Sequence, residues 1–317
     1  MLLVYYLHIQ RVVDLATDGL HVAVHRGFLV VSREKAEVGR VALDDILSVI
    51  AHAHGLTWSN TVFSRLADRA VPVVLCAQNH APVACVWPME GSYLQGARLI
   101  AQAQAGRPLV KRLWRDVVAA KIRMQGAVLA SAGGEAGAFE TLARKVKSGD
   151  PENVEAQAAR RYWKALMGAE FRRDADGGGA NALLNYGYTV LRATVARAIC
   201  GAGLHPGLGL HHSNRGNAFA LADDLMEPYR PFVDRAVLTL LGRGVDEVTS
   251  EAKRVLVALT SLDLQGRHGT TPLHLHAARL ARDLAASFAS GVEDVDLPMP
   301  PEPLVLAGMG TCPGAPA

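Results

Sequence analysis

One acidic residue occupies a position where a helix is expected to present only apolar side chains. Glu155 shares one helical stripe with Ala158, Ala159, Tyr162 and Leu166 when residues are projected at 100° per position. Burying a carboxylate costs free energy unless something pairs with it. A divalent metal ion is one such partner, and a metal held by carboxylates and an imidazole is typical of phosphoryl-transfer chemistry.

The helix that should carry Glu155 has clear signals at both ends. Asp150 suits an N-cap, Pro151 suits the first helical position, and Gly168 suits the end. An acid near a helix start can simply complement the helix dipole, but Glu152 fills that role better. Glu155 is therefore expected to lie a turn deeper. A different face carries three basic residues, Arg160, Arg161 and Lys164.

A second polar cluster follows about sixty residues later. The segment 203–212 is rich in helix breakers and ends in His211-His212, so it is expected to be a loop. A helix over roughly 218–227 would place Asp224 and Glu227 side by side, and Pro228 would end it. An alternative stays open at this point, in which the acids are solvated and the histidines cap carbonyl groups.

The types of these side chains limit the metal. Two carboxylates and one imidazole, without a thiolate, favour Mg²⁺ or Mn²⁺ over structural Zn²⁺. The sequence has no phosphate-binding GxxxxGK[ST] loop, no GxGxxG opening a helix and no GxSxG nucleophile motif. Nucleotide hydrolysis, a dinucleotide cofactor and serine-hydrolase chemistry are therefore not indicated.

Charge is unevenly distributed along the 317 residues, although the formal net charge is only +3. Residues 107–173 contain 14 Lys and Arg but 7 Asp and Glu, a local excess of +7. A basic block of this size suits a polyanionic partner, although a solvated face with imperfect balance would look the same.

Composition predicts an ordinary globular protein. Hydrophobic residues make up 50% of the chain, and no apolar run reaches the roughly 18 residues needed to cross a bilayer. The four cysteines form no CxxC pair, and the first residues do not resemble a signal peptide. We expect a cytoplasmic protein with free thiols and no membrane association.

The pattern of residues predicts an α+β protein with several parts. Residues 1–90 contain short β-rich runs with turns at Asp18-Gly19 and Arg26-Gly27, interrupted by one helix at about 60–69. Residues 91–297 read as periodic helical segments and are expected to be all-α. Residues 298–317 are rich in Pro and Gly, which indicates a disordered tail.

Four segments in this order resemble the motifs of the CRISPR-associated integrase family, the catalytic subunit of the spacer-acquisition complex. EAQAARRYW at 155–163 resembles the family's glutamate motif, and NALLNYGY at 181–188 resembles the helix that follows it. GLHPGLGLHH at 203–212 resembles the histidine segment, and DLMEPYRP at 224–231 resembles the acidic motif. The similarity covers about residues 10–290. Ala156 stands where glycine is common in the family. The spacing is most similar to the variant that accompanies single-protein RNA-guided nucleases.

The resemblance implies a fold, a ligand set and partners. It implies an N-terminal β-sandwich-like domain for dimerisation and a helical catalytic domain whose metal ligands are Glu155, His212 and Glu227. His212 is preferred to His211 because the family's histidine lies three residues after the glycine matching Gly209. Asp224 is a second candidate for the third ligand. The implied partners are a small ferredoxin-like protein that bridges two homodimers and, with it, the RNA-guided effector nuclease.

The predicted activity is a metal-dependent DNA integrase and endonuclease. A 3′-hydroxyl of a short foreign DNA would attack a phosphodiester of the CRISPR repeat, with no covalent enzyme intermediate. Double-stranded DNA would be held by basic residues, namely Arg112, Arg115, Arg160, Arg161 and Lys164. Two alternatives stay open: a metal-dependent nuclease acting on branched DNA, and a noncatalytic DNA-binding scaffold.

Overall fold

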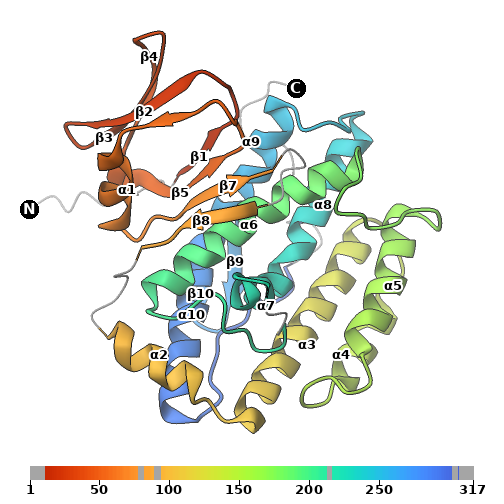
Figure 1. The fold of residues 1–317 in the computed structure, drawn as a ribbon. Coiled ribbons are helices and arrows are strands. Elements are labelled where there is room, and N and C mark those ends of the chain that lie inside the picture. Colours follow the sequence, from red (N-terminus) through yellow and green to blue (C-terminus); the bar gives the residue numbers. More distant parts are fainter. Residues whose placement is uncertain (1–10, 78–81, 89–93, 213–215, 302–305, 307–317) are drawn as a thin grey trace, which may run out of the picture. The chain divides into compact units, whose positions relative to one another are not determined.

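Two compact units make up the chain in the computed structural model, Met1–Gly91 and Ser92–Ala317. The structure describes residues 11–77, 82–88, 94–212, 216–301 and 306. Strands dominate the first unit and helices dominate the second (Figure 1). The expected α+β class, with a sheet region preceding a helical region, is therefore confirmed at this level.

The first unit contains two four-stranded sheets. Their strand orders are β1-β5-β7-β8 and β4-β3-β2-β6. Strands β2 and β3 form a hairpin whose turn residues Arg26 and Gly27 both have positive φ, 47° and 84°. This is the geometry that favours a tight two-residue hairpin, and it confirms the expected turn. The elements are β1 Arg11–Leu15, β2 Leu20–His25, β3 Phe28–Arg33, β4 Ala36–Ala42, η1 Leu43–Asp45, β5 Ile46–Ala51, β6 Thr57–Trp58, α1 Asn60–Ala67, β7 Val73–Cys76 and β8 Pro82–Val86.

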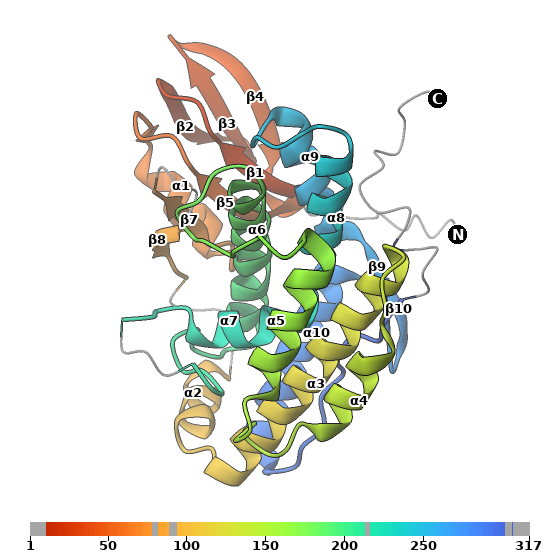
Figure 2. The same cartoon turned by 90° about the vertical axis from the view of Figure 1, so that its right-hand side faces the viewer.

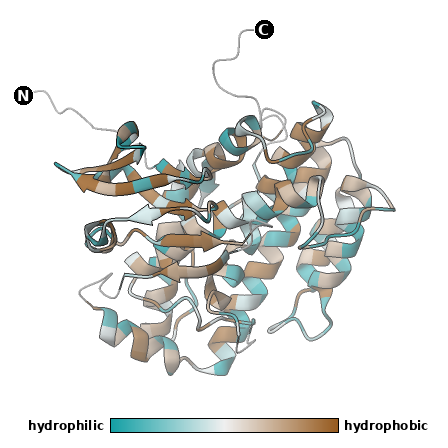
Figure 3. Ribbon diagram, turned by 45° about the horizontal axis from the view of Figure 1, so that its top comes forward, coloured by the Kyte–Doolittle hydropathy of each residue, from teal (hydrophilic) through white to brown (hydrophobic). Residues whose placement is uncertain are grey.

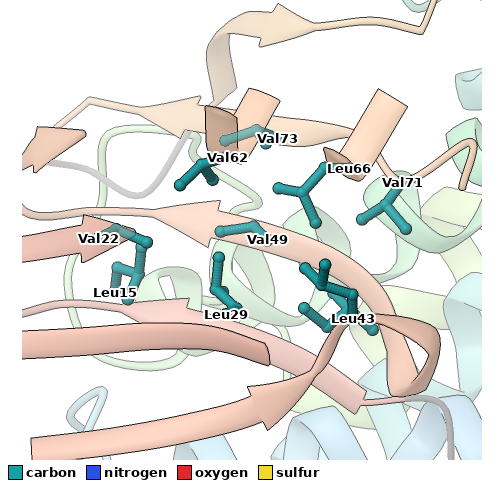
Figure 4. Close-up of a cluster of buried hydrophobic side chains, with 10 residues drawn as sticks. Leu15, Val22, Leu29, Leu43, Val49, Val62, Leu66, Val71 and Val73 are labelled. Carbon is teal, nitrogen blue, oxygen red and sulfur yellow. The ribbon is translucent and has the colours of Figure 1, made fainter. Parts of the chain in front are cut away.

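One hydrophobic core holds the first unit together. Leu15 and Val49 come from one sheet, Val22 and Leu29 come from the other, and Leu66 comes from α1 (Figure 4). All five side chains are buried. Alternating apolar residues therefore turn one face of each sheet toward the same interior.

The second unit is a helical assembly built around α3. Helices α3, α4 and α5 lie side by side (Figure 2), and α3 also contacts η2. Hydrophobic and hydrophilic residues alternate around these helices, as amphipathic packing requires (Figure 3). The elements are α2 Gln95–Ala103, α3 Arg107–Ser131, α4 Gly137–Lys145, α5 Val154–Met167, α6 Ala180–Gly201, α7 Ala220–Met226, η2 Glu227–Tyr229, α8 Arg230–Gly242, α9 Ser250–Ala258, η3 Leu259–Ser261 and α10 Leu273–Ser290.

The expectation of an all-α second region is wrong in one place. Strands β9 (Asp263–Gly266) and β10 (Gly269–Pro272) form an antiparallel hairpin between η3 and α10. Leu264 is buried while Asp263 and Gln265 are exposed, so a period-2 pattern is present but only four residues long. Gly269 supplies the positive φ of 99° that follows the turn.

The expected disordered tail is wrong at its beginning. The backbone N–H of Met299 donates to the Gln265 carbonyl at 2.8 Å, so the chain is still docked on β9 at this point. Residues 302–305 and 307–317 lie outside the described residues, and the expectation for them stays untested. Among the described residues, no helix combines the length and apolar character needed to cross a membrane.

Candidate active site

Glu155 is fixed by the way helix α5 begins. The helix starts at Val154 rather than at Pro151, because Asp150 and Asn153 both adopt left-handed backbone with φ of 47° and 51°. The Asp150 carboxylate accepts hydrogen bonds from the N–H groups of Val154 at 2.8 Å and Glu155 at 3.0 Å. The expected N-cap is therefore wrong, since Asn153 occupies that position, and Glu155 lies in the first turn.

The apolar stripe predicted for this helix is confirmed. Ala158, Tyr162 and Leu166 are buried, and the Glu155 side chain is 20% exposed. Its Oε1 accepts a hydrogen bond of 2.6 Å from Lys121 Nζ, on α3. The partially buried acid is thus balanced by a lysine from the neighbouring helix.

Glu227 meets the same lysine from the other side. Lys121 Nζ lies 2.5 Å from Glu227 Oε2, and Arg230 Nε lies 3.0 Å from Glu227 Oε1. Glu227 itself is 4% exposed and begins η2, the 3₁₀ turn that contains Pro228. Burial alone would raise the pKa of Glu227, but Arg230 and Lys121 more than offset it and hold that pKa below its usual value. The carboxylates of Glu155 and Glu227 therefore converge on one ammonium group.

Burial and neighbouring charges shift the pKa of Lys121 in opposite directions, as they do for Glu227. Desolvation would lower the pKa of Lys121, but the carboxylates of Glu227 and Glu155 outweigh it and keep that pKa above its usual value. The lysine is therefore a charged group in a largely buried place.

Asp224 is directed at the histidine segment. The carboxylate is fully buried and accepts hydrogen bonds from the backbone N–H groups of Leu210 at 2.5 Å and His211 at 3.0 Å. It also lies 2.5 Å from His212 Nδ1. Gly209 permits this closure, because a Cβ there would lie 2.7 Å from Asp224 Oδ2. Asp224 thus holds the loop and one nitrogen of the His212 ring.

The two adjacent histidines have different surroundings. The His211 ring stacks on buried Trp114 with centroids 4.6 Å apart and planes at 2°. The His212 ring meets Trp114 edge-on at 5.8 Å, and its side chain is 42% exposed. The hydrogen bond to Asp224 raises the pKa of His212 above its usual value, despite partial burial. Because Nδ1 is engaged, Nε2 is the nitrogen of His212 that remains for a ligand.

The structure brings together some of the predicted site residues and separates others. Glu155 and Glu227 meet at Lys121, whereas Asp224 is engaged with the loop before it. His212 and Glu227 are near enough to influence each other electrostatically. Within the described ranges, no three His, Cys, Asp or Glu side chains are already arranged to hold a metal ion.

The predicted DNA-binding residues divide into two groups. Arg160, Arg161 and Lys164 are exposed on α5. By contrast, Arg112 Nε pairs with Glu293 at 2.8 Å, and Arg115 pairs with Glu293 at 2.5 Å and with Asp116 at 2.7 Å. The charges of Arg112 and Arg115 are therefore compensated within the protein.

Sequence reasoning missed Lys121 and a buried acid next to the site. Asp234 accepts hydrogen bonds from Tyr162 at 2.9 Å and Tyr188 at 2.5 Å, and burial raises its pKa to about 7. Lys121, Glu227, Arg230 and Asp234 all line one cavity of about 160 Å³. A signal for Lys121 was present, because it shares a helical face with buried residues, namely Trp114, Val117, Val118, Gln125 and Val128.

Comparison with known proteins shows the family to which this chain belongs. The family model described as "CRISPR associated protein Cas1" matches residues 14–259. A "CRISPR-associated endonuclease Cas1" from Neisseria meningitidis serogroup C is 34% identical over 268 residues, which covers 83% of this chain and 86% of that protein. A second, from Thermus thermophilus, is 31% identical and covers 73% and 76%. The chain belongs to the Cas1 endonuclease/integrase family.

Solved structures share the fold at lower identity. A casposase bound to integration product has a TM-score of 0.75 and 21% identity, covering 90% of this chain and 92% of that one. A Cas1 protein from Thermotoga maritima has a TM-score of 0.71 and 19% identity, covering 89% and 100%. The sequence-based family assignment is thus confirmed by independent matches of sequence and fold.

Proposed function

We propose that this protein is a divalent-metal-dependent DNA integrase of CRISPR adaptation, which joins 3′-hydroxyl ends of short foreign DNA to the CRISPR repeat. The observation that carries the proposal is the meeting of Glu155 and Glu227 at a single positive charge, 2.6 and 2.5 Å from Lys121 Nζ. Two carboxylates from separate elements that meet at one positive charge are placed to share a divalent ion as well, since carboxylate oxygens are the ligands that Mg²⁺ and Mn²⁺ prefer.

The donor set fits Mg²⁺ or Mn²⁺. Glu227 Oε2 is buried and lies 2.5 Å from the Lys121 ammonium group, so this oxygen already faces a positive charge. Glu155, Glu227 and Nε2 of His212 would be the ligands. Asp224 is better suited to orienting His212, because its two oxygens already accept hydrogen bonds from the loop. A metal ion bound there would polarise the target phosphate and stabilise developing charge.

The protein's side chains would position the DNA strands and balance the charge of their phosphates. The 3′-hydroxyl of the incoming strand attacks the target phosphodiester, forming one new phosphodiester and releasing one 3′-hydroxyl, so no covalent enzyme intermediate is needed. Arg160, Arg161 and Lys164 would hold phosphates without reading sequence. Arg230 keeps Glu227 ionised for its task.

The proposed assembly follows the named relatives. One solved structure with this fold is a Cas6-RT-Cas1–Cas2 complex, with a TM-score of 0.71 and 19% identity, and the match covers 35% of the matched chain in that complex. Another is a Cas1–DNA complex, with a TM-score of 0.54 and 16% identity. We infer that this protein also forms a homodimer, acts in the cytoplasm on double-stranded DNA and joins a small ferredoxin-like partner that bridges two dimers. An RNA-guided effector nuclease is a further proposed partner.

The test is a strand-transfer assay. A short duplex with free 3′-hydroxyls is incubated with a repeat-containing plasmid, the partner protein and Mn²⁺. We expect Glu155→Gln and Glu227→Gln to lower joining by about 100-fold or more, since each removes a charge at the reacting centre. The matched control is Glu170→Gln, an exposed acid just beyond the end of α5, which should join normally. Normal joining by Glu155→Gln would contradict the proposal.

The same gel separates the alternative functions. Cut but unjoined strands would indicate a nuclease that uses water as the nucleophile. Salt-sensitive DNA binding with neither cutting nor joining would indicate a noncatalytic scaffold.

A further inference from the structure

Lys121 occupies the place that a cation bound by Glu155 and Glu227 would take. Its Nζ lies 2.6 Å from Glu155 Oε1 and 2.5 Å from Glu227 Oε2. A divalent ion bound to the same two oxygens would lie about 2.0–2.2 Å from each. A divalent ion that bridges these two oxygens on the side now occupied by Lys121 Nζ could bind only after the ammonium group has moved away, because two cations repel each other strongly at such short range.

A second position for the ammonium group is available nearby. Gln125 lies one helical turn after Lys121 on α3 and lines the same cavity of about 160 Å³. Gln125 is 3% exposed, and its Oε1 is a buried acceptor without a hydrogen-bond partner. Such an acceptor costs free energy while it stays unpaired. An ammonium group that leaves the carboxylates could satisfy it by rotating its flexible stem.

We propose that Lys121 is a built-in competitor for the metal site, which holds Glu155 and Glu227 together without metal and moves toward Gln125 Oε1 when Mg²⁺ or Mn²⁺ binds. Lys121 is thus a positioning residue, and this inference rests on the proposed metal-dependent function. The exchange keeps two close carboxylates neutralised at all times. It also means that metal must displace a salt-bridged ammonium, so the lysine weakens apparent metal affinity.

The decisive measurement is Mn²⁺ binding to DNA-free protein by calorimetry. Lys121→Met removes the charge and keeps the length of the side chain, so we expect Mn²⁺ to bind at least about tenfold more tightly than to wild type. The exposed control Lys145→Met should bind as wild type does. If Lys121 instead stays beside bound metal and orients the carboxylates, Lys121→Met will bind Mn²⁺ more weakly, and the inference is overturned.

Gln125 provides a second variant that is independent of the first. Gln125→Met removes the acceptor that would receive the ammonium group, so it should weaken Mn²⁺ binding when Lys121 is present. In a Lys121→Met background the same change should have little effect, because there is no ammonium to accommodate. Additive effects of the two substitutions would overturn the proposed movement.

A double variant separates this inference from the proposed function. With Lys121 unchanged, the double variant Glu155→Gln/Glu227→Gln should no longer bind Mn²⁺. Retention of binding would mean that the metal lies elsewhere, which overturns the proposed site and this inference together. Loss of binding combined with unchanged affinity in Lys121→Met would leave the site intact and overturn the inference alone.

Discussion

Asp234 is a buried carboxyl group whose charge changes within the ordinary pH range. It is 2% exposed, and burial raises its pKa from 3.8 to about 7 despite hydrogen bonds from Tyr162 and Tyr188. The unfolded chain loses this proton near pH 3.9, whereas the folded chain keeps it until about pH 7. The raised pKa therefore contributes stability below about pH 4 that is lost as pH rises to 7.

Replacing Asp234 tests this linkage. Wild type should lose on the order of 4 kcal/mol of unfolding free energy from this group between pH 4 and 7, and Asp234→Asn should remove most of that dependence. Urea unfolding at a series of pH values measures it. Equal slopes of unfolding free energy against pH in both proteins would show that Asp234 is not the responsible group.

The choice between Asp224 and Glu227 shows a limit of sequence reasoning at this scale. A spacing of three puts both acids on one face of an ideal helix, so the pattern alone treats them alike. In the structure, the α-helix ends at Met226 and Glu227 begins a 3₁₀ turn. Asp224 therefore reaches the loop at Leu210, while Glu227 reaches Lys121. The partners of each acid come from distant segments, which periodicity cannot supply.

At the scale of the element, the start of α5 determines where Glu155 lies. Asp150 accepts hydrogen bonds from two N–H groups that would otherwise lack partners at the helix start. Asp150→Ala should therefore lower the unfolding free energy by about 1–2 kcal/mol and weaken Mn²⁺ binding through displaced Glu155. Thermal or urea unfolding together with calorimetry measures both effects.

Glu152→Ala is the matched control for this helix. Glu152 is exposed and precedes the helix, and its carboxylate pairs with Lys147 rather than with a helical N–H group. A change within about 0.5 kcal/mol is expected. Equal losses from the two substitutions would contradict the capping role of Asp150.

Elements with strong local signals were predictable. The motif at 181–188, expected to lie on a helix, falls within α6, Ala180–Gly201, and the hairpin at Arg26-Gly27 forms as expected. Strand β4 is hard to predict from sequence, because it is largely exposed and lacks the alternation of a half-buried strand. Helix α5 starts later than the sequence predicts. Asp150 and Asn153 both adopt left-handed backbone, and the sequence pattern alone does not predict this conformation at either residue.

At the scale of the whole molecule, the exposed basic face of α5 should dominate DNA binding. Arg160, Arg161 and Lys164 are replaced together, each by Gln. The slope of log DNA affinity against log salt concentration should then become shallower by the equivalent of about three phosphate contacts. Fluorescence anisotropy with a nonspecific duplex over a range of salt concentrations measures this slope.

Arg112 and Arg115 give an internal comparison for the same experiment. Because Glu293 pairs with both arginines, the double variant Arg112→Gln/Arg115→Gln should change the salt slope of DNA affinity by less than the equivalent of one phosphate contact. A slope lowered as much as in the α5 variant would show that DNA follows α3 instead. The basic block was visible in the sequence, but the compensation by Glu293 was not, since that acid lies about 180 residues away.

The position of bound metal tests the central claim most directly. Crystals of the protein grown with Mn²⁺ should give one strong anomalous peak within about 2.5 Å of carboxylate oxygens of both Glu155 and Glu227. His212 Nε2 should complete the protein ligands, with Asp224 still bonded to the other ring nitrogen. A peak coordinated by Asp224 in place of Glu227, or one remote from Glu155, would contradict the account.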